Sequence, residues 1–306
     1  MHTRTIALAD ARWGLLLITF AAISWGTVGI ASNAIYELLG NRSFALSLSI
    51  GFLRLAFSLP ALALLSWTLL GPRTWQVARA DLPWIGLIGV AMAGYQVSYF
   101  AAVAQVGVTI AVLVALCSAP VIVALLSALL LREPLAGRVL LALGAALAGT
   151  VLLVGLPADM AAQRRMLLGT LLALGAALSY AIVALCSRTL AGHYHPLQSI
   201  TLGFGVGALL LLPCALLAGL VMNYPVSGWA WLLHLGLIPT ALGYLLFFTG
   251  MRHTTATAAS ITTLLEPLTS ALLAWWLFDE RLGSLGLLGG TLLLGAMLLL
   301  YLPARR

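Results

Sequence analysis

Ionisable side chains are rare inside the long apolar stretches of this sequence, and Glu266 is the first candidate for chemistry. It stands near the middle of the apolar stretch 255–277, directly before Pro267. A carboxylate enclosed in this way can bind and release a proton and so drive another process. Alternatively, Glu266 is structural and bonds backbone groups that the proline leaves free. The sequence leaves both roles open.

Arg54 and His234 are the other ionisable candidates. Arg54 lies inside the stretch 46–69, where its charge needs either a partner or a route to the edge of the apolar layer. The carboxylate of a ligand or of Glu266 could be that partner, and snorkelling to the outer surface is the simpler reading. His234 can accept a hydrogen bond from a ligand or respond to pH near neutrality. A single histidine is, however, more often a satisfied interior residue.

Aromatic and hydroxyl side chains recur near the centres of several apolar stretches. Tyr95 and Tyr99 are four residues apart, so they share one helix face. Aromatic walls with a few polar groups suit a small amphipathic molecule, whereas aromatic residues near stretch ends are typical of interfacial belts. The candidate ligand-binding residues are Ser24, Trp25, Tyr95, Gln96, Tyr99, Ser179, Tyr180, His234, Tyr244, Ser260 and Thr263, with Glu266 and Arg54 as candidates for charge coupling.

The elements that position these residues must lie in a membrane. Of the 306 residues, 62% are hydrophobic and only 8% are charged, against about 25% charged in soluble domains. A bilayer-spanning helix needs roughly 20 apolar residues, and such stretches recur along the chain. The sequence predicts ten transmembrane helices, at 13–35, 46–69, 83–103, 108–130, 137–156, 166–187, 197–220, 229–250, 255–277 and 283–302.

Arginine supplies all of the basic residues, and it predicts the orientation. The formal net charge is +7, but the arginines stand singly or in pairs between apolar stretches, which excludes a nucleic-acid partner and is typical of topology signals. With ten spans, the amino-terminal side carries Arg4, Arg12, Arg73, Arg79, Arg132, Arg138, Arg188, Arg252, Arg305 and Arg306. The opposite side carries Arg42, Arg164, Arg165 and Arg281. Both termini are therefore predicted to be cytoplasmic, in a multi-pass protein of the inner (plasma) membrane.

An internal repeat divides the chain in two. A constant shift of 147 residues aligns residues 84–135 with residues 231–282 without a gap, and a shift of 155 brings Trp25 onto Tyr180. The first shift matches Trp84 with Trp231, Pro120 with Pro267 and Glu133 with Glu280. We therefore expect two five-helix repeats, at 1–157 and 158–306.

Five is an odd number, so the second repeat must enter the membrane from the opposite face. Inverted repeats are the architecture of many secondary transporters, in which the ligand site lies near the midplane and access alternates. A gene duplication without a transport role is the alternative. Pro120 and Pro267 hold matching midspan positions, where proline kinks a helix. These kinks are either hinges for alternating access or passive features of helix shape.

The motifs resemble those of a known family. Glu133 and Glu280 stand at the ends of matching spans, and Leu265-Glu266-Pro267 is followed by Ala271-Leu272-Leu273. This pattern is similar to the second-repeat signature of the EamA-type transporters, in the drug/metabolite transporter superfamily. The resemblance implies a secondary transporter that exports small metabolites, and the aromatic amino-acid exporter branch is the expected one.

The expected function is export of neutral or aromatic amino acids across the bacterial inner membrane by alternating access. One alternative is a multidrug or quaternary-cation exporter, because aromatic walls and Glu266 suit a cation. A membrane-embedded enzyme is the alternative of another class, but the sequence lacks the usual hydrolase and metalloprotease motifs and a P-loop. No cofactor or metal is expected, since the three cysteines have no metal-like spacing. The expected partners are a small-molecule substrate and the lipid bilayer, with the oligomeric state left open.

Overall fold

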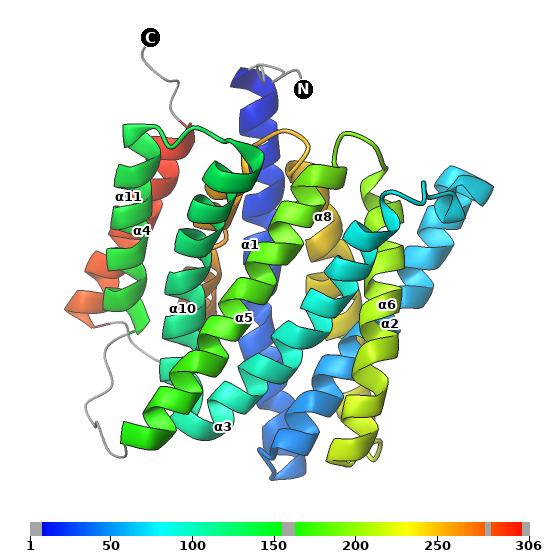
Figure 1. Cartoon of the computed structure of the whole chain (residues 1–306). Coiled ribbons are helices and arrows are strands. Elements are labelled where there is room, and N and C mark those ends of the chain that lie inside the picture. The colour runs from blue at the N-terminus through cyan, green and yellow to red at the C-terminus, as the bar shows by residue number, and fades with distance from the viewer. Residues whose placement is uncertain (1–7, 155–162, 279–282, 302–306) are drawn as a thin grey trace.

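Helices make up all the regular secondary structure in the residues that the computed structural model describes, which are 8–154, 163–278 and 283–301 (Figure 1). The all-α class is therefore confirmed for this part of the chain. In chain order the elements are α1 (Leu8–Leu39), α2 (Phe44–Leu70), the 3-10 helix η1 (Gly71–Trp75), α3 (Leu82–Leu126), the π-helix η2 (Ser127–Leu131), α4 (Gly137–Val154), α5 (Gln163–Leu190), α6 (Pro196–Ala218), α7 (Val226–Leu235), the π-helix η3 (Gly236–Leu242), α8 (Gly243–Gly250), α9 (Ala256–Thr262), α10 (Leu265–Phe278) and α11 (Ser284–Tyr301).

Some sequence predictions lie outside the described residues. These are the Glu280 and Arg281 of the repeat motif, the arginines at both termini, and the repeat boundary at residue 157. The ends of the described helices are nevertheless informative, because α1 begins and α11 ends at the same end of the molecule (Figure 1). We call this the amino-terminal end. The side of the membrane that it faces stays a prediction.

Seven segments of the described chain are long and apolar enough to cross a bilayer. They are Asp10–Leu39, Phe44–Trp75, Leu82–Val106, Val114–Leu131, Met166–Leu190, Pro196–Ala218 and Val226–Gly250. The predicted spans 137–156 and 283–302 correspond to shorter apolar helices, Gly137–Leu152 and Ser284–Leu300. The predicted span 255–277 is divided between α9 and α10. Ten complete crossings therefore stay a prediction.

Helix α3 doubles back on itself and supplies two of these segments. A straight helix of 45 residues would be about 68 Å long. At the start of α3, however, Asp81 accepts a hydrogen bond from the Tyr194 hydroxyl. Beyond its end, Glu133 Oε1 lies 3.4 Å from Arg188 Nε. Since Arg188 and Tyr194 both belong to the end of α5 and its following turn, the two ends of α3 lie together. The predicted spans 83–103 and 108–130 are therefore two legs, and Figure 1 shows the reversal.

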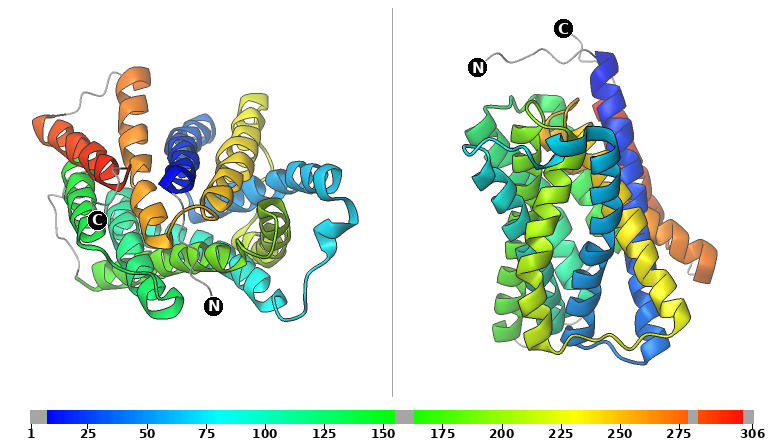
Figure 2. Two further views of the ribbon diagram at one scale, coloured as in Figure 1. Left: turned by 90° about the horizontal axis from the view of Figure 1, so that it is seen from above. Right: turned by 90° about the vertical axis from the view of Figure 1, so that its right-hand side faces the viewer.

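Helix α1 packs against helices of the carboxy-terminal half of the chain. Seen from above, α1 lies between α10 and the α7–α8 segment (Figure 2), and it contacts each of them. The two legs of α3 pack along α5, while α4 and α11 pack together at one edge of the bundle. This arrangement places the first helix of the chain beside helices that are far from it in the sequence.

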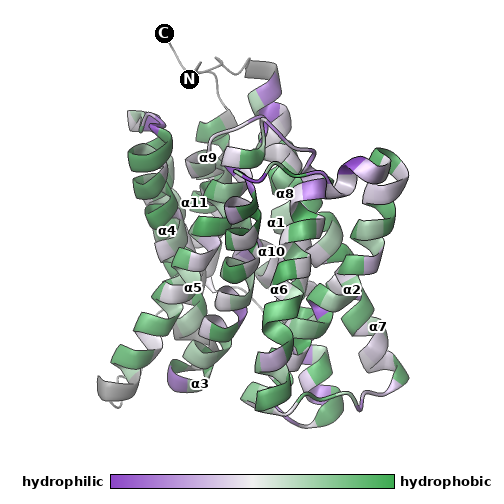
Figure 3. Cartoon of the chain, turned by 45° about the vertical axis from the view of Figure 1, so that its right-hand side comes forward, coloured by the Kyte–Doolittle hydropathy of each residue, from purple (hydrophilic) through white to green (hydrophobic). Residues whose placement is uncertain are grey.

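The outer surface is apolar and the helix contacts are close, as a membrane requires. Figure 3 shows hydrophobic residues over most of the helix surfaces, and Leu217 is 90% exposed. Such side chains face lipid without cost. Inside, Gly89 of α3 packs on Gly203 of α6, where an added Cβ at Gly89 would lie 2.8 Å from the Gly203 carbonyl oxygen. Small residues allow this approach in membrane bundles.

The break between α9 and α10 corrects one sequence expectation. Pro267 was expected to kink a continuous helix over 255–277, but α9 ends at Thr262 and α10 begins at Leu265. A proline ring clashes with the carbonyl group four residues earlier, which here belongs to Thr263. That carbonyl instead accepts a hydrogen bond of 3.0 Å from the Glu266 backbone N–H. Pro120, by contrast, lies inside the second leg of α3, where the helix continues past the proline.

Candidate functional site

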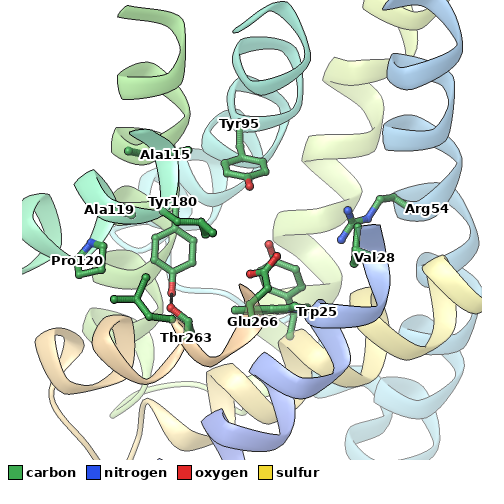
Figure 4. A pocket seen from close by; sticks show the side chains of 14 residues that line it. Trp25, Val28, Arg54, Tyr95, Ala115, Ala119, Pro120, Tyr180, Thr263 and Glu266 are labelled. Carbon is green, nitrogen blue, oxygen red and sulfur yellow. Dashed lines mark hydrogen bonds between the residues drawn. The ribbon is translucent and has the colours of Figure 1, made fainter. Parts of the chain in front are cut away.

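A cavity lies about halfway along the helices, where α1, α2, α3, α5, α8 and the α9–α10 break converge (Figure 4). It holds about 80 Å³ of space for water-sized molecules, enough for several waters. Its walls are aromatic and small apolar side chains with one acid and one base. The lining residues are Trp25, Val28, Arg54, Tyr95, Ala115, Leu116, Ala119, Pro120, Ala177, Tyr180, Tyr244, Thr263, Leu264 and Glu266.

Trp25 anchors the wall formed by α1. Its indole N–H donates a hydrogen bond of 2.8 Å to the carbonyl oxygen of Pro239. Its ring packs against Tyr244, with ring centroids 4.8 Å apart, and against Phe247 at 5.4 Å. Because the indole N–H is buried, this hydrogen bond offsets the cost of removing it from water. The ring is therefore fixed in one orientation at the cavity.

A proline in η3 explains how Arg54 is held. Pro239 has no N–H group, so the helical hydrogen bond to the carbonyl oxygen of Leu235 is missing. The Thr240 hydroxyl donates to that oxygen instead, at 2.7 Å. The same hydroxyl accepts a hydrogen bond of 3.0 Å from Arg54 Nε. Thr240 therefore satisfies a carbonyl that the π-helix exposes and positions the arginine at the same time. Such π-helical insertions recur at functional sites.

Glu266 lies in the first turn of α10, at the break in the helix. Negative charge is favourable at a helix N-terminus, and discontinuous helices in transporters often mark binding sites. Within the described chain, no hydrogen bond or ion pair joins the Glu266 carboxylate to another residue. Figure 4 shows this carboxylate and the Arg54 guanidinium pointing into the same cavity from different helices.

Three tyrosines complete the polar part of the cavity wall. The hydroxyl of Tyr180 is 3.1 Å from the Thr263 hydroxyl, so α5 is linked to the break between α9 and α10. The Tyr95 ring stacks on Tyr99, with centroids 5.7 Å apart and planes nearly parallel. Tyr95 lines the cavity, while Tyr99 supports it from the next helical turn. The third tyrosine of the wall is Tyr244.

Several predicted hydroxyl residues bond their own helices instead of lining the cavity. Ser24 donates to the Ala21 carbonyl oxygen at 2.7 Å, and Ser260 donates to that of Thr257 at 2.9 Å. Both serines are buried. Serine often satisfies its hydroxyl in this way inside a helix, so these two residues are helix contacts in this conformation.

Two more predicted residues belong to helix interfaces. Gln96 is buried against Gly51 of α2, and Ser179 faces Gly94 of α3. Each polar side chain lies beside a glycine that brings two helices close together. Neither residue lines the cavity.

His234 and Pro267 also lie away from the cavity wall. His234 Nε2 is 3.0 Å from the hydroxyl of Thr27, which agrees with a satisfied interior histidine. Pro267 directly follows Glu266 at the break between α9 and α10. The sequence predictions for these two residues as ligand and hinge stay predictions.

The residues that sequence reasoning missed are mostly small and apolar. Val28, Ala115, Leu116, Ala119, Ala177 and Leu264 complete the cavity wall. Ala119 carried a usable signal, because the shift of 147 aligns it with Glu266. Thr240 was also recognisable from the sequence, because it is a hydroxyl residue that directly follows a midspan proline. The others are indistinguishable from ordinary helix-packing residues.

Polar contacts close the molecule at its amino-terminal end. Both oxygens of the Glu133 carboxylate accept hydrogen bonds of 3.1 Å from the backbone N–H of Ala256, and Arg188 donates to the Met251 carbonyl at 3.0 Å. The hydroxyls of Ser127 and Thr257 are 2.8 Å apart. These contacts join the end of α3 to α5 and to the α8–α9 connection.

The packing between this end and the cavity is also tight. Ile18, Ala184 and Ala259 are fully buried there. The cavity is therefore sealed from the amino-terminal end.

The sequence profile of the EamA-like transporter family matches the chain twice, over residues 12–155 and 167–302. The chain belongs to this family. This multi-pass membrane transporter is 32% identical to a protein of Archaeoglobus fulgidus described as an uncharacterized transporter, over 95% of the chain and 97% of that protein. It is 31% identical to the uncharacterized transporter YwfM of Bacillus subtilis strain 168, over 95% of the chain and 94% of that relative.

A solved crystal structure has the same fold as this transporter. The TM-score is 0.79, the sequence identity is 22%, and the match covers 94% of this chain and 97% of that one. At this identity the likeness shows the fold alone. The expectation of a transporter from the drug/metabolite transporter superfamily is confirmed, and its cargo is a matter for proposal.

Proposed function

We propose that the transporter exports neutral amino acids, aromatic ones included, across the bacterial inner membrane. The observation that carries this proposal is the cavity itself, in which one acid and one base stand among aromatic rings at the centre of the bundle. A neutral amino acid has one positive charge, one negative charge and an apolar side chain. The cavity offers a complementary group for each of these.

The proposed architecture has ten crossings in two inverted five-helix repeats, 1–157 and 158–306, with both termini cytoplasmic. The repeated family match supports this division, as do the internal sequence repeat and the excess of arginine on one side. The cavity draws its lining from helices of both proposed repeats, which is the expected position of a site that alternates between faces.

Alternating access is the proposed mechanism. The seal at the amino-terminal end would correspond to a state closed toward the cytoplasm. Opening would require Glu133 to release Ala256 and Arg188, while the helix break before Glu266 lets α10 move relative to α9. Such rearrangements exchange one set of contacts for another of similar energy.

Uptake into proteoliposomes tests the proposed function. The purified transporter is reconstituted, and uptake of labelled phenylalanine and leucine is compared with that of a labelled quaternary amine, with and without a pH gradient. We expect uptake of the amino acids above that of protein-free vesicles. If neither amino acid moves under any gradient, the proposed cargo is wrong.

A quaternary-cation exporter is the second candidate, favoured by one observation. The Glu266 carboxylate lies beside Trp25 and Tyr180 in the cavity, and aromatic rings with a carboxylate bind organic cations. Arg54 opposes this reading, because its positive charge faces the same space. Uptake of the quaternary amine in preference to phenylalanine would favour this candidate.

A further inference from the structure

An acidic and a basic side chain line the cavity without forming an ion pair. Arg54 extends from α2 and Glu266 from α10, and the described residues contain no ion pair between them. Ionised groups inside a membrane are costly unless they have partners. A group that carries both charges and fits between them would satisfy each.

The Arg54 guanidinium is oriented for an anion. Its Nε donates to the Thr240 hydroxyl at 3.0 Å, and Thr240 is itself fixed by its bond to the Leu235 carbonyl oxygen. The two terminal nitrogens make no hydrogen bond to any described residue. A guanidinium held at Nε in this way presents its remaining N–H groups as a planar pair, which matches the two oxygens of a carboxylate.

The Glu266 side of the cavity is suited to an ammonium group. The carboxylate has no protein partner in the described chain, and the ring of Trp25 lies next to it (Figure 4). An ammonium group there could donate to the carboxylate and contact an aromatic face. The remaining walls, formed by Tyr95, Tyr180 and Tyr244 with mostly apolar residues, carry no charge.

We infer that the transporter recognises the zwitterionic group of a free α-amino acid, with Arg54 binding the carboxylate and Glu266 binding the ammonium group. Thr240 acts as a positioning residue for Arg54. The inference rests on the proposed function and makes it more specific, because it excludes the amides, esters and N-acylated forms of the same amino acids. Each of these leaves one of the two cavity charges without a partner.

Competition binding tests the inference. Labelled L-phenylalanine is bound to the purified transporter, and L-phenylalanine, L-phenylalaninamide and N-acetyl-L-phenylalanine are used as competitors. The amide lacks the carboxylate and the acetyl form lacks the ammonium group, while all three share the side chain. We expect each modified form to compete about tenfold or more weakly, since hydrogen bonds to charged groups are among the strongest in proteins.

Variants then show which group of the ligand each of the two side chains binds. For variants that bind phenylalanine too weakly for competition, the affinity of each ligand is measured by direct titration. Arg54→Gln should weaken phenylalanine about tenfold or more while leaving the amide unchanged, so that the preference between them disappears. Glu266→Gln should remove the preference over the N-acetyl form in the same way. Thr240→Val should reduce the preference for phenylalanine over its amide only in part, because Arg54 is still present. The matched controls are Arg42→Gln and Glu37→Gln, which remove an exposed ion pair of 2.8 Å outside the cavity.

The outcomes separate the inference from the proposed function. If the wild-type protein binds and transports phenylalanine but all three ligands compete equally, the inference is wrong and the proposed function stands. A uniform loss for every ligand in Arg54→Gln and Glu266→Gln would show a structural role and also overturn the inference. If the wild-type protein neither binds nor transports any amino acid, the proposed function is wrong, and the inference that rests on it is wrong as well.

Discussion

Both carboxylate oxygens of Glu133 accept hydrogen bonds from the backbone N–H of Ala256, each at 3.1 Å. Ala256 is the first residue of α9, so the carboxylate satisfies a free N–H group at the positive end of that helix. Glu133 follows α3, and the contact therefore holds together segments that are far apart in the sequence. The contact lies at the amino-terminal end of the molecule, where the cavity is closed.

Neutralising Glu133 should open this end of the transporter. Glu133→Gln keeps the shape but loses the charge, which should cost the closed state about 1 kcal/mol, or about fivefold in the open population. The native Cys186 reports on opening, because it is 1% exposed and lies two residues before Arg188. In a Cys117→Ala, Cys214→Ala background, thiol labelling of Cys186 should become several times faster. Glu37→Gln is the control, and equal labelling rates in the two variants would contradict the prediction.

Trp25→Phe should destabilise the transporter while preserving an aromatic ring at the cavity. The substitution leaves the Pro239 carbonyl oxygen without its 2.8 Å hydrogen bond, a loss of about 1–3 kcal/mol for a buried group. Thermal unfolding in detergent should therefore begin several degrees lower. Trp276→Phe, on the 76% exposed tryptophan of α10, is the matched control. A melting temperature equal to that of the control would show that the bond is unimportant.

Pro267→Ala should slow transport more than it weakens binding. Alanine restores the N–H group and removes the clash with the Thr263 carbonyl, so α9 and α10 can join into one stiffer helix. We expect the transport rate to fall about tenfold, which corresponds to about 1.4 kcal/mol in the barrier, with phenylalanine affinity within about threefold of wild type. Pro120→Ala, inside the second leg of α3, should have a smaller effect. A larger effect at Pro120 would argue against the hinge at the α9–α10 break.

Glu266→Gln tests proton coupling. If the carboxylate carries a proton during the cycle, the variant should lose accumulation driven by a pH gradient. Glu266→Asp keeps the ionisable group and should retain part of the response. Uptake is measured at saturating phenylalanine, so that weaker binding does not mask the result. Undiminished gradient-driven uptake by Glu266→Gln would remove this role.

The sequence was sufficient for the helical class, and midspan aromatic residues were useful guides to the cavity. Trp25, Tyr95, Tyr180 and Tyr244 were among the candidates, together with Tyr99, because an interfacial belt does not explain aromatic residues near span centres. The structure gathers the first four around one space. Arg54 and Glu266 followed from the cost of charge in a membrane.

The misses have physical causes. Ser24 and Ser260 bond to carbonyl groups of their own helices, an alternative that composition cannot distinguish from a ligand contact. The role of Thr240 depends on which carbonyl the π-helix frees and on how close α2 approaches. The helix break at Thr263 depends on whether tertiary contacts accommodate the proline by a kink or by a gap. These are properties of neighbouring helices that one sequence does not reveal.

Photo-crosslinking tests most directly whether this cavity binds the substrate. Labelled azidophenylalanine is irradiated with the purified transporter, and the modified peptides are mapped by mass spectrometry. Crosslinks should fall on the segments that contain Trp25, Tyr95, Tyr180 and Glu266, and excess phenylalanine should suppress them. Crosslinks confined to other segments, or unaffected by phenylalanine, would contradict the assignment of this cavity as the substrate site.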